Sequence, residues 1–155
     1  MEMPKVTDEH RKLYVFAGEW SGPEKMMPGP MGPGGDATGE TKARVDIDGF
    51  FVISDYVQKK ADGSIGYRGH GVYGFDPGTG EHTWYWVDSM GFPSVPSRGT
   101  WDGDTLTFRA KHGEHAQSRY VYRFEGRDTH HFKIENCFDG QNWVTFMEAT
   151  YHRKA

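Results

Sequence analysis

The sequence predicts an all-β fold, an up-and-down antiparallel β-barrel of about ten strands with one short N-terminal helix. Two features of the composition favour a β-rich fold: aromatic residues make up 15% of the 155 residues, and 21 residues are glycine. A third feature is the spacing of turn sequences such as Asp62-Gly63 and Asp102-Gly103, which recur about every 8–14 residues. Connections this short exclude crossover helices, so neighbouring strands pair antiparallel. About ten strands in one sheet would expose two edges, and closing the sheet into a barrel removes them.

One helix is predicted, over residues 7–17, at the start of a single domain that covers residues 1–155. Thr7 is a suitable N-cap, acidic residues follow it in the first turn, and Gly18 ends the helix. Residues 26–36 contain three methionines, three prolines and several glycines. Because proline cannot donate a hydrogen bond to a β-ladder, this segment is predicted to be a mobile loop. Its methionines would suit a lid over an apolar ligand, although a surface loop without a role explains it equally well.

Alternation along the strands predicts which side chains face the barrel interior. The predicted strands are 19–25, 38–47, 50–60, 64–75, 81–88, 98–101, 104–111, 116–125, 130–138 and 143–152. Register at the Asp48-Gly49 turn places Tyr56 inside, and Tyr122 is a further candidate for the cavity lining. In the last hairpin the same reasoning places Asn136, Trp143 and Met147 on one inner face. Tyr56, Tyr122, Asn136 and Met147 could bind a ligand in a cavity, or they could be ordinary core packing.

The chain shows two resemblances to known families, one in a short segment and one over nearly its whole length. Phe16-Ala17-Gly18-Glu19-Trp20-Ser21-Gly22 resembles the Gly-x-Trp signature of lipocalin-like barrels, the calycins. That resemblance implies that Trp20 plugs the closed end of a barrel and that a basic residue of the last strand, here Arg153, packs on it. Nearly the whole chain resembles a bacterial family known only as domain of unknown function 1579, most clearly in Arg68-Gly69-His70-Gly71-Val72-Tyr73-Gly74-Phe75-Asp76 and Trp84-Tyr85-Trp86-Val87-Asp88-Ser89-Met90-Gly91. This second resemblance implies a calycin-like barrel and gives no reaction.

A polar cluster on two neighbouring strands is the main candidate ligand site. Arg68 and His70 lie two residues apart on one strand, so they share a face. Trp86 and Asp88 do the same on the next strand. One register sets Arg68 opposite Asp88 and His70 opposite Trp86, and a slip of one residue breaks both pairs. Inside a cavity, Arg68 or His70 would bind a carboxylate or phosphate-like group and Asp88 would orient one of them. On the outer surface, an Arg68–Asp88 pair would contribute only about 0–1 kcal/mol.

Charge and composition exclude several classes of protein. The formal net charge is -4 and no basic patch runs along the chain, so no nucleic-acid partner is expected. No apolar stretch approaches the length of a bilayer span, and residues 1–12 lack the apolar core of a signal peptide. We therefore expect a cytoplasmic protein without a membrane partner, as a monomer or a homodimer. Cys137 is the single cysteine, so neither an internal disulfide nor a multi-cysteine zinc site is predicted.

The function predicted from these observations is non-enzymatic binding of a small, partly apolar molecule in the barrel cavity, as a carrier or sensor. One alternative is a small enzyme that uses His70 and Asp88 as acid and base. Another is a haem-binding barrel, in which His70 or His152 could hold the iron. No cofactor is otherwise expected. The chain has no Gly-x-Ser-x-Gly elbow, and no catalytic residue is assigned.

Overall fold

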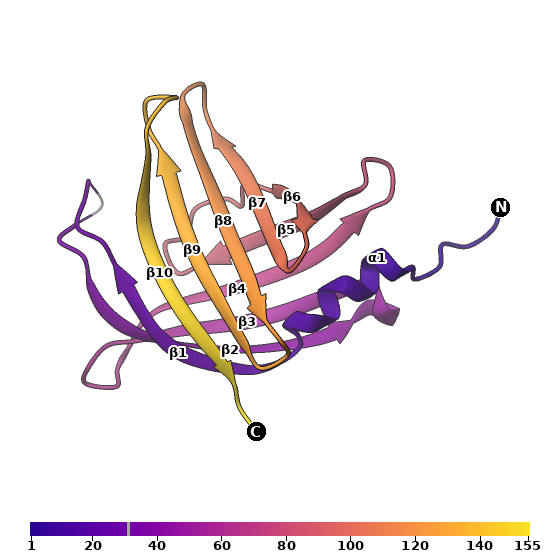
Figure 1. Ribbon diagram of the computed structural model, residues 1–155, viewed down its shortest axis with the longest axis horizontal. Helices are drawn as coiled ribbons and strands as arrows, with labels where there is room; N and C mark the ends of the chain where they lie inside the picture. The colour runs from indigo at the N-terminus through magenta and orange to yellow at the C-terminus, as the bar shows by residue number, and fades with distance from the viewer. Residues whose placement is uncertain (31) are drawn as a thin grey trace.

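The computed structural model describes residues 1–30 and 32–155 as a closed barrel of ten antiparallel strands with a short helical segment at the N-terminus. The strands are β1 (Gly18–Met26), β2 (Gly35–Asp46), β3 (Phe51–Lys59), β4 (Ile65–Asp76), β5 (Glu81–Asp88), β6 (Ser97–Asp102), β7 (Thr105–His112), β8 (Ala116–Glu125), β9 (Thr129–Cys137) and β10 (Trp143–Arg153). Each strand pairs with its neighbour in sequence, and β1 pairs with β10 to close the sheet. The predicted fold is therefore confirmed. In Figure 1, β7–β10 run steeply across β2–β4, which gives the barrel two roughly crossed walls.

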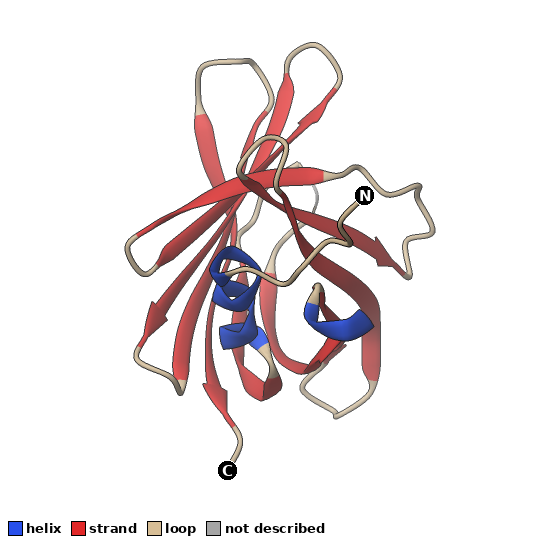
Figure 2. Cartoon of the chain, turned by 90° about the vertical axis from the view of Figure 1, so that its right-hand side faces the viewer, coloured by secondary structure: helices blue, strands red, loops and turns tan. Residues whose placement is uncertain are grey.

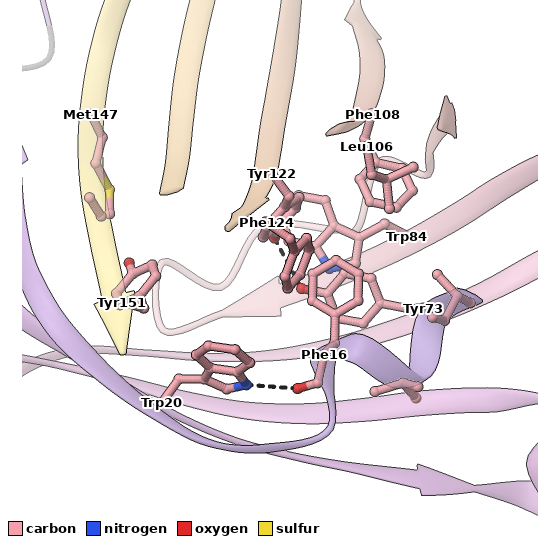
Figure 3. Close-up of a cluster of buried hydrophobic side chains, with 13 residues drawn as sticks. Phe16, Trp20, Tyr73, Trp84, Leu106, Phe108, Tyr122, Phe124, Met147 and Tyr151 are labelled. Atoms are coloured by element: carbon pink, nitrogen blue, oxygen red, sulfur yellow. Dashed lines mark hydrogen bonds between the residues drawn. The ribbon is translucent and has the colours of Figure 1, made fainter. Parts of the chain in front are cut away.

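The helical segment covers one end of the barrel (Figure 2). It consists of α1 (Asp8–Arg11) and a 3₁₀ turn, η1 (Lys12–Phe16), close to the predicted bounds of 7–17. The backbone N–H of Thr7 donates to His10 Nδ1 at 3.0 Å, which satisfies one free donor at the start of the helix. Phe16 points into the barrel and stacks on Tyr73, with ring centroids 4.4 Å apart (Figure 3). This segment thus closes the barrel and supplies part of its core.

Trp20 lies at the closed end, as the calycin resemblance implied. Its side chain is 1% exposed, and its indole Nε1 donates to the Phe16 carbonyl at 2.9 Å (Figure 3). The Arg153 guanidinium of β10 lies 4.3 Å from the centroid of the indole ring, a cation–π contact. Arg153 also donates to the carbonyls of Ala17 and Val15. The two ends of the chain are therefore joined at this point, and the expected Trp20–Arg153 contact is confirmed.

The Met/Pro/Gly loop is shorter than predicted. β1 continues to Met26 and β2 begins at Gly35, and these two residues pair across the hairpin. The connecting loop is therefore 27–34 rather than 26–36, because its prolines, at 28, 30 and 33, all lie between the paired ends and leave Met26 and Gly35 free to pair. Met31 lies outside the described residues. The mobility of this loop stays a prediction, which limited proteolysis would test.

A β-bulge changes the last hairpin. The register between β9 and β10 shifts between Thr145 and Met147, so one extra residue stands in β10. Met147 keeps its inward position and is 6% exposed. Trp143, on the other side of the bulge, faces outward, and the Arg119 guanidinium lies 4.0 Å from its ring centroid. The prediction that Trp143 shares a face with Met147 was wrong, because a single inserted residue reverses the alternation.

Candidate functional site: an aromatic cavity with two carboxylates

The barrel encloses a cavity of about 750 Å³. Ten strands make a barrel wider than the eight-stranded kind that side chains nearly fill. Aromatic side chains make up much of the wall: Phe16, Trp20, Tyr56, Tyr67, Tyr73, Trp84, Trp86, Tyr120, Tyr122, Phe132, Phe146 and Tyr151. Apolar side chains of the β5–β6 connection complete it at one side: Met90, Phe92, Pro93 and Val95. The site is therefore apolar with a small number of polar groups, the usual character of a small-molecule site.

Strands β4 and β5 supply the wall that the sequence singled out, but in the other register. Asp88 pairs with Gly69 and Trp86 pairs with Gly71, so Trp86 and Asp88 face the cavity together with two glycines. Arg68 and His70 face the outer surface. The prediction that Arg68 and His70 converge with Trp86 and Asp88 was wrong by one residue of register.

On the outer surface, His70 makes a polar contact of its own. Its Nδ1 lies 2.8 Å from Oδ1 of Asp55 on β3, and both side chains are exposed. Arg68 is also exposed, and its backbone N–H donates to Ser89 Oγ at 3.1 Å. Neither residue contributes to the cavity wall.

The inward glycines explain this register. A Cβ atom built on Gly69 would lie 1.9 Å from Cζ2 of Trp86, and one on Gly71 would lie 2.9 Å from Nε1 of Trp84. The two indoles therefore lie against the bare backbone of β4 and fill the space that side chains would need. The alternating glycines of β4 were the sequence signal for the correct face, because bulky tryptophans on β5 require small residues opposite them.

Asp88 is held by three donors at the end of β5. Its Oδ2 accepts hydrogen bonds from the Tyr67 hydroxyl at 2.6 Å and from Trp86 Nε1 at 2.9 Å. Its Oδ1 accepts from the backbone N–H of Met90 at 3.0 Å. Burial and the hydrogen bond to Asp88 raise the pKa of Tyr67, so its hydroxyl stays protonated and remains a donor. The carboxylate is thus fixed in one orientation on the cavity wall.

A second carboxylate, Glu24 of β1, was missed by the sequence analysis. Its side chain is 2% exposed and accepts hydrogen bonds from the Tyr56 hydroxyl at 2.7 Å and from Gln58 Nε2 at 2.9 Å. The Tyr151 hydroxyl is its third donor. The signal was present: Glu24 lies four residues after Trp20 on the same strand, so it shares the face of a residue predicted to be buried.

The remaining predicted site residues lie on the cavity wall. The hydroxyls of Tyr122 and Tyr73 are 3.0 Å apart (Figure 3). Asn136 accepts from the Ser118 hydroxyl at 2.7 Å, which in turn lies 3.0 Å from Nε2 of His112. Tyr56 and Met147 also line the cavity. The positions of these four side chains agree with the predicted inner face.

Histidines reach the cavity from positions other than those proposed for haem. His70 and His152 both lie on the outer face and are exposed to solvent, so neither can hold an iron inside the barrel. His112 and His130 are the histidines that line the cavity. Burial lowers the pKa of His130 to about 3, so its imidazole is neutral at pH 7. Within residues 1–30 and 32–155, no group of three or more His, Cys, Asp or Glu side chains is arranged to hold a metal ion.

Comparison with protein families now identifies the chain. The model of a family of proteins of unknown function, DUF1579, matches residues 5–153. The chain belongs to this family. None of the curated proteins matches it. No helix in the described part of the chain is long and apolar enough to cross a bilayer.

Several solved structures have the same barrel fold as this chain. Rv2717c from M. tuberculosis superposes with a TM-score of 0.75 and 16% identity, over 97% of this chain and 100% of that chain. The S-type phycobiliprotein lyase CPES from Guillardia theta has a TM-score of 0.65 and 10% identity, over 98% and 99%. A de novo designed fluorescence-activating β-barrel has a TM-score of 0.50 and 11% identity, over 96% and 100%. At these identities the comparisons establish the fold.

Proposed function

We propose that this DUF1579 protein binds a small, partly apolar molecule inside the barrel and acts as a carrier or sensor rather than as an enzyme. The observation that supports this most directly is the cavity of about 750 Å³, which lies within the ~300–1,000 Å³ range of small-molecule sites. Its aromatic walls offer a large apolar contact area to a ligand. Two barrels of the same fold, a phycobiliprotein lyase and a fluorescence-activating design, support a role for the interior.

Tyr122, Asn136 and the Asp88–Trp86 pair would orient the ligand through hydrogen bonds, with Tyr56 and Met147 as contact surface. The acid–base pair of the enzymatic alternative does not form, because His70 and Asp88 face opposite sides of the wall. A monomer or homodimer in the cytoplasm remains our expectation for the assembly and its location.

A neutral fluorescent probe tests the proposal. N-Phenyl-1-naphthylamine gains fluorescence in apolar sites, and we expect it to bind the wild-type protein with saturation. Thr41 lines the cavity, and Thr41→Trp would fill part of it; Lys42→Trp places the same indole on the outer face of the same strand. We expect Thr41→Trp to weaken probe binding by about tenfold or more and Lys42→Trp to leave it unchanged. Equal binding by both variants would overturn the proposal. Native mass spectrometry of the freshly purified protein would then identify a retained natural ligand.

A further inference from the structure

Two acidic groups, one on the cavity wall and one behind it, lack cationic partners among the described residues. Asp88 lines the cavity and Glu24 bonds to two tyrosines of its wall. Among the lining residues that the structure describes there is no lysine or arginine. None of the ion pairs formed by residues 1–30 and 32–155 involves Asp88 or Glu24. Buried charges are ordinarily paired, so this imbalance requires an explanation.

Both acidic groups contribute to the raised pKa of tyrosines that line the interior. Tyr120 comes from β8, which does not neighbour β5, yet the charge of Asp88 adds to burial in raising the Tyr120 pKa. In the same way, burial and then the charge of Glu24 raise the pKa of Tyr56 and Tyr151. Each of these tyrosines therefore stays neutral and remains a hydrogen-bond donor.

The aromatic side chains beside Asp88 form a continuous row. Ring centroids are 5.8 Å apart for Tyr56 and Trp86, and 5.5 Å apart for Trp84 and Trp86. The rings of Tyr120 and Trp84 meet edge to face, with their centroids 4.9 Å apart. The faces of indole and phenol rings carry partial negative charge and attract cations, most strongly away from water. An organic cation is thus favoured both by the carboxylates and by the walls.

We infer that the cavity selects a hydrophobic organic cation, a protonated amine on an aromatic or aliphatic body, whose ammonium group contacts Asp88 beside the face of Trp86. This inference rests on the proposed binding function and names the chemical class of its ligand. An ammonium group would donate to the carboxylate oxygens of Asp88 in a charge-assisted hydrogen bond. An anionic ligand, which the sequence suggested through Arg68 and His70, would meet Asp88 and no lysine or arginine among the described lining residues.

Three probes that share one ring test the charge preference. 1-Naphthylmethylamine is protonated at pH 7, 1-naphthalenemethanol is neutral and 1-naphthoate is anionic. Isothermal titration calorimetry on the full chain should give a dissociation constant for the ammonium at least about tenfold lower than for the alcohol, with the weakest binding for the carboxylate. Equal binding of all three, or tighter binding of the alcohol or carboxylate, would overturn the inference. The proposed function would survive that result provided that N-phenyl-1-naphthylamine binds.

A pair of matched variants tests the contact with Asp88. Asp88→Asn keeps the shape of the side chain and removes its charge, and we expect the ratio of the ammonium affinity to the alcohol affinity to fall about tenfold. Circular dichroism and the thermal unfolding midpoint, compared with those of the wild type, serve as the check that the variant is folded. Asp55→Asn removes the same charge from the outer surface, where the side chain is exposed, and should change the preference by less than about twofold.

The remaining outcomes of these titrations distinguish three claims: the role of Asp88, the charge class of the ligand and the proposed binding function. If Asp88→Asn leaves the preference intact, the assignment of Asp88 is wrong. The charge series on the wild-type protein does not depend on either variant, so it decides the ligand class even if Asp88→Asn fails to fold. If neither the series nor the neutral probe binds the wild-type protein, the proposed function itself fails.

Discussion

The Glu24 carboxylate of β1 occupies the space that a side chain on Gly39 of β2 would need. A Cβ atom built on Gly39 would lie 2.1 Å from Oε2 of Glu24 and 3.0 Å from the ring of Tyr151. Glu24 cannot simply move away, because Tyr56, Gln58 and Tyr151 all donate to it. The buried acid and the glycine beneath its carboxylate are therefore one structural unit, and disturbing either should disturb the other.

Gly39→Ala should destabilise the protein by about 1–3 kcal/mol, because the added methyl group displaces a fixed carboxylate from its donors. The free energy of unfolding in urea would measure this. Gly66→Ala is the matched control on β4: its Cβ would meet only the end of the exposed Lys60 side chain, at 2.9 Å. We expect the control to stay within about 0.5 kcal/mol of the wild type. A cost for Gly66→Ala as large as that for Gly39→Ala would contradict this account.

Tyr151→Phe should cost about 1.5–3 kcal/mol of stability, since it removes one hydrogen bond to a buried charged group and leaves Glu24 short of a donor. Tyr85→Phe is the comparison, because Tyr85 is 43% exposed on the outer face of β5. Its change in unfolding free energy should be close to zero. Similar values for the two variants would mean that the tyrosine hydroxyls around Glu24 contribute nothing to folding.

Most of the barrel could be predicted from the sequence because its turns are local. Glycine-containing turns mark the strand ends, and the antiparallel order follows from the shortness of the connections. The position of Trp20 followed from its place directly after the helix. The closed topology then required only that β1 meet β10, as it does.

The candidate site was harder to predict because a shift of one residue in strand register exchanges the side chains that face inward with those that face outward. The connection from Asp76 to Glu81 fits either register by length alone, and a shift of one residue exchanges Arg68 and His70 for Gly69 and Gly71 on the inner face. Side-chain volume decides the question, since Trp86 needs bare backbone opposite it. Glu24 was missed for another reason: a glutamate in a strand usually faces water, and this expectation outweighed its spacing from Trp20. Its burial is explained by donors that lie far from it in the sequence, Tyr56 of β3 and Tyr151 of the neighbouring strand β10.

Trp20→Ala should destabilise the protein by about 3–5 kcal/mol, the range for emptying a large core site. The loss includes the contact with Arg153 and the hydrogen bond to Phe16. Trp143→Ala, at the outer face beneath Arg119, loses a cation–π contact at a more exposed site and should cost about 1 kcal/mol. Thermal unfolding followed by circular dichroism would compare them. A smaller loss for Trp20→Ala than for Trp143→Ala would mean that Trp20 does not anchor the closed end.

Stability should fall as the pH drops below about 6.5, partly because of His130. This side chain is 5% exposed, and its ring centroid lies 4.4 Å from that of Trp20. Burial lowers its pKa from 6.5 to about 3 in the folded protein. Between these values the unfolded chain binds a proton that the folded protein does not. The stabilisation is therefore complete above about pH 6.5 and is lost progressively towards pH 3.

One buried histidine of this kind contributes a slope of about 1 kcal/mol per pH unit below its unfolded pKa. Urea unfolding of the wild type and of His130→Phe between about pH 7 and pH 5, above the range in which ordinary carboxylates titrate, isolates that slope. The variant should lose less stability over this interval. Some dependence should remain, because burial also lowers the pKa of His10 and His82. His115→Gln, whose side chain is 73% exposed, should retain the wild-type slope. An unchanged slope in His130→Phe would show that His130 takes up a proton in the folded protein as readily as in the unfolded chain, which its burial beside Trp20 should prevent.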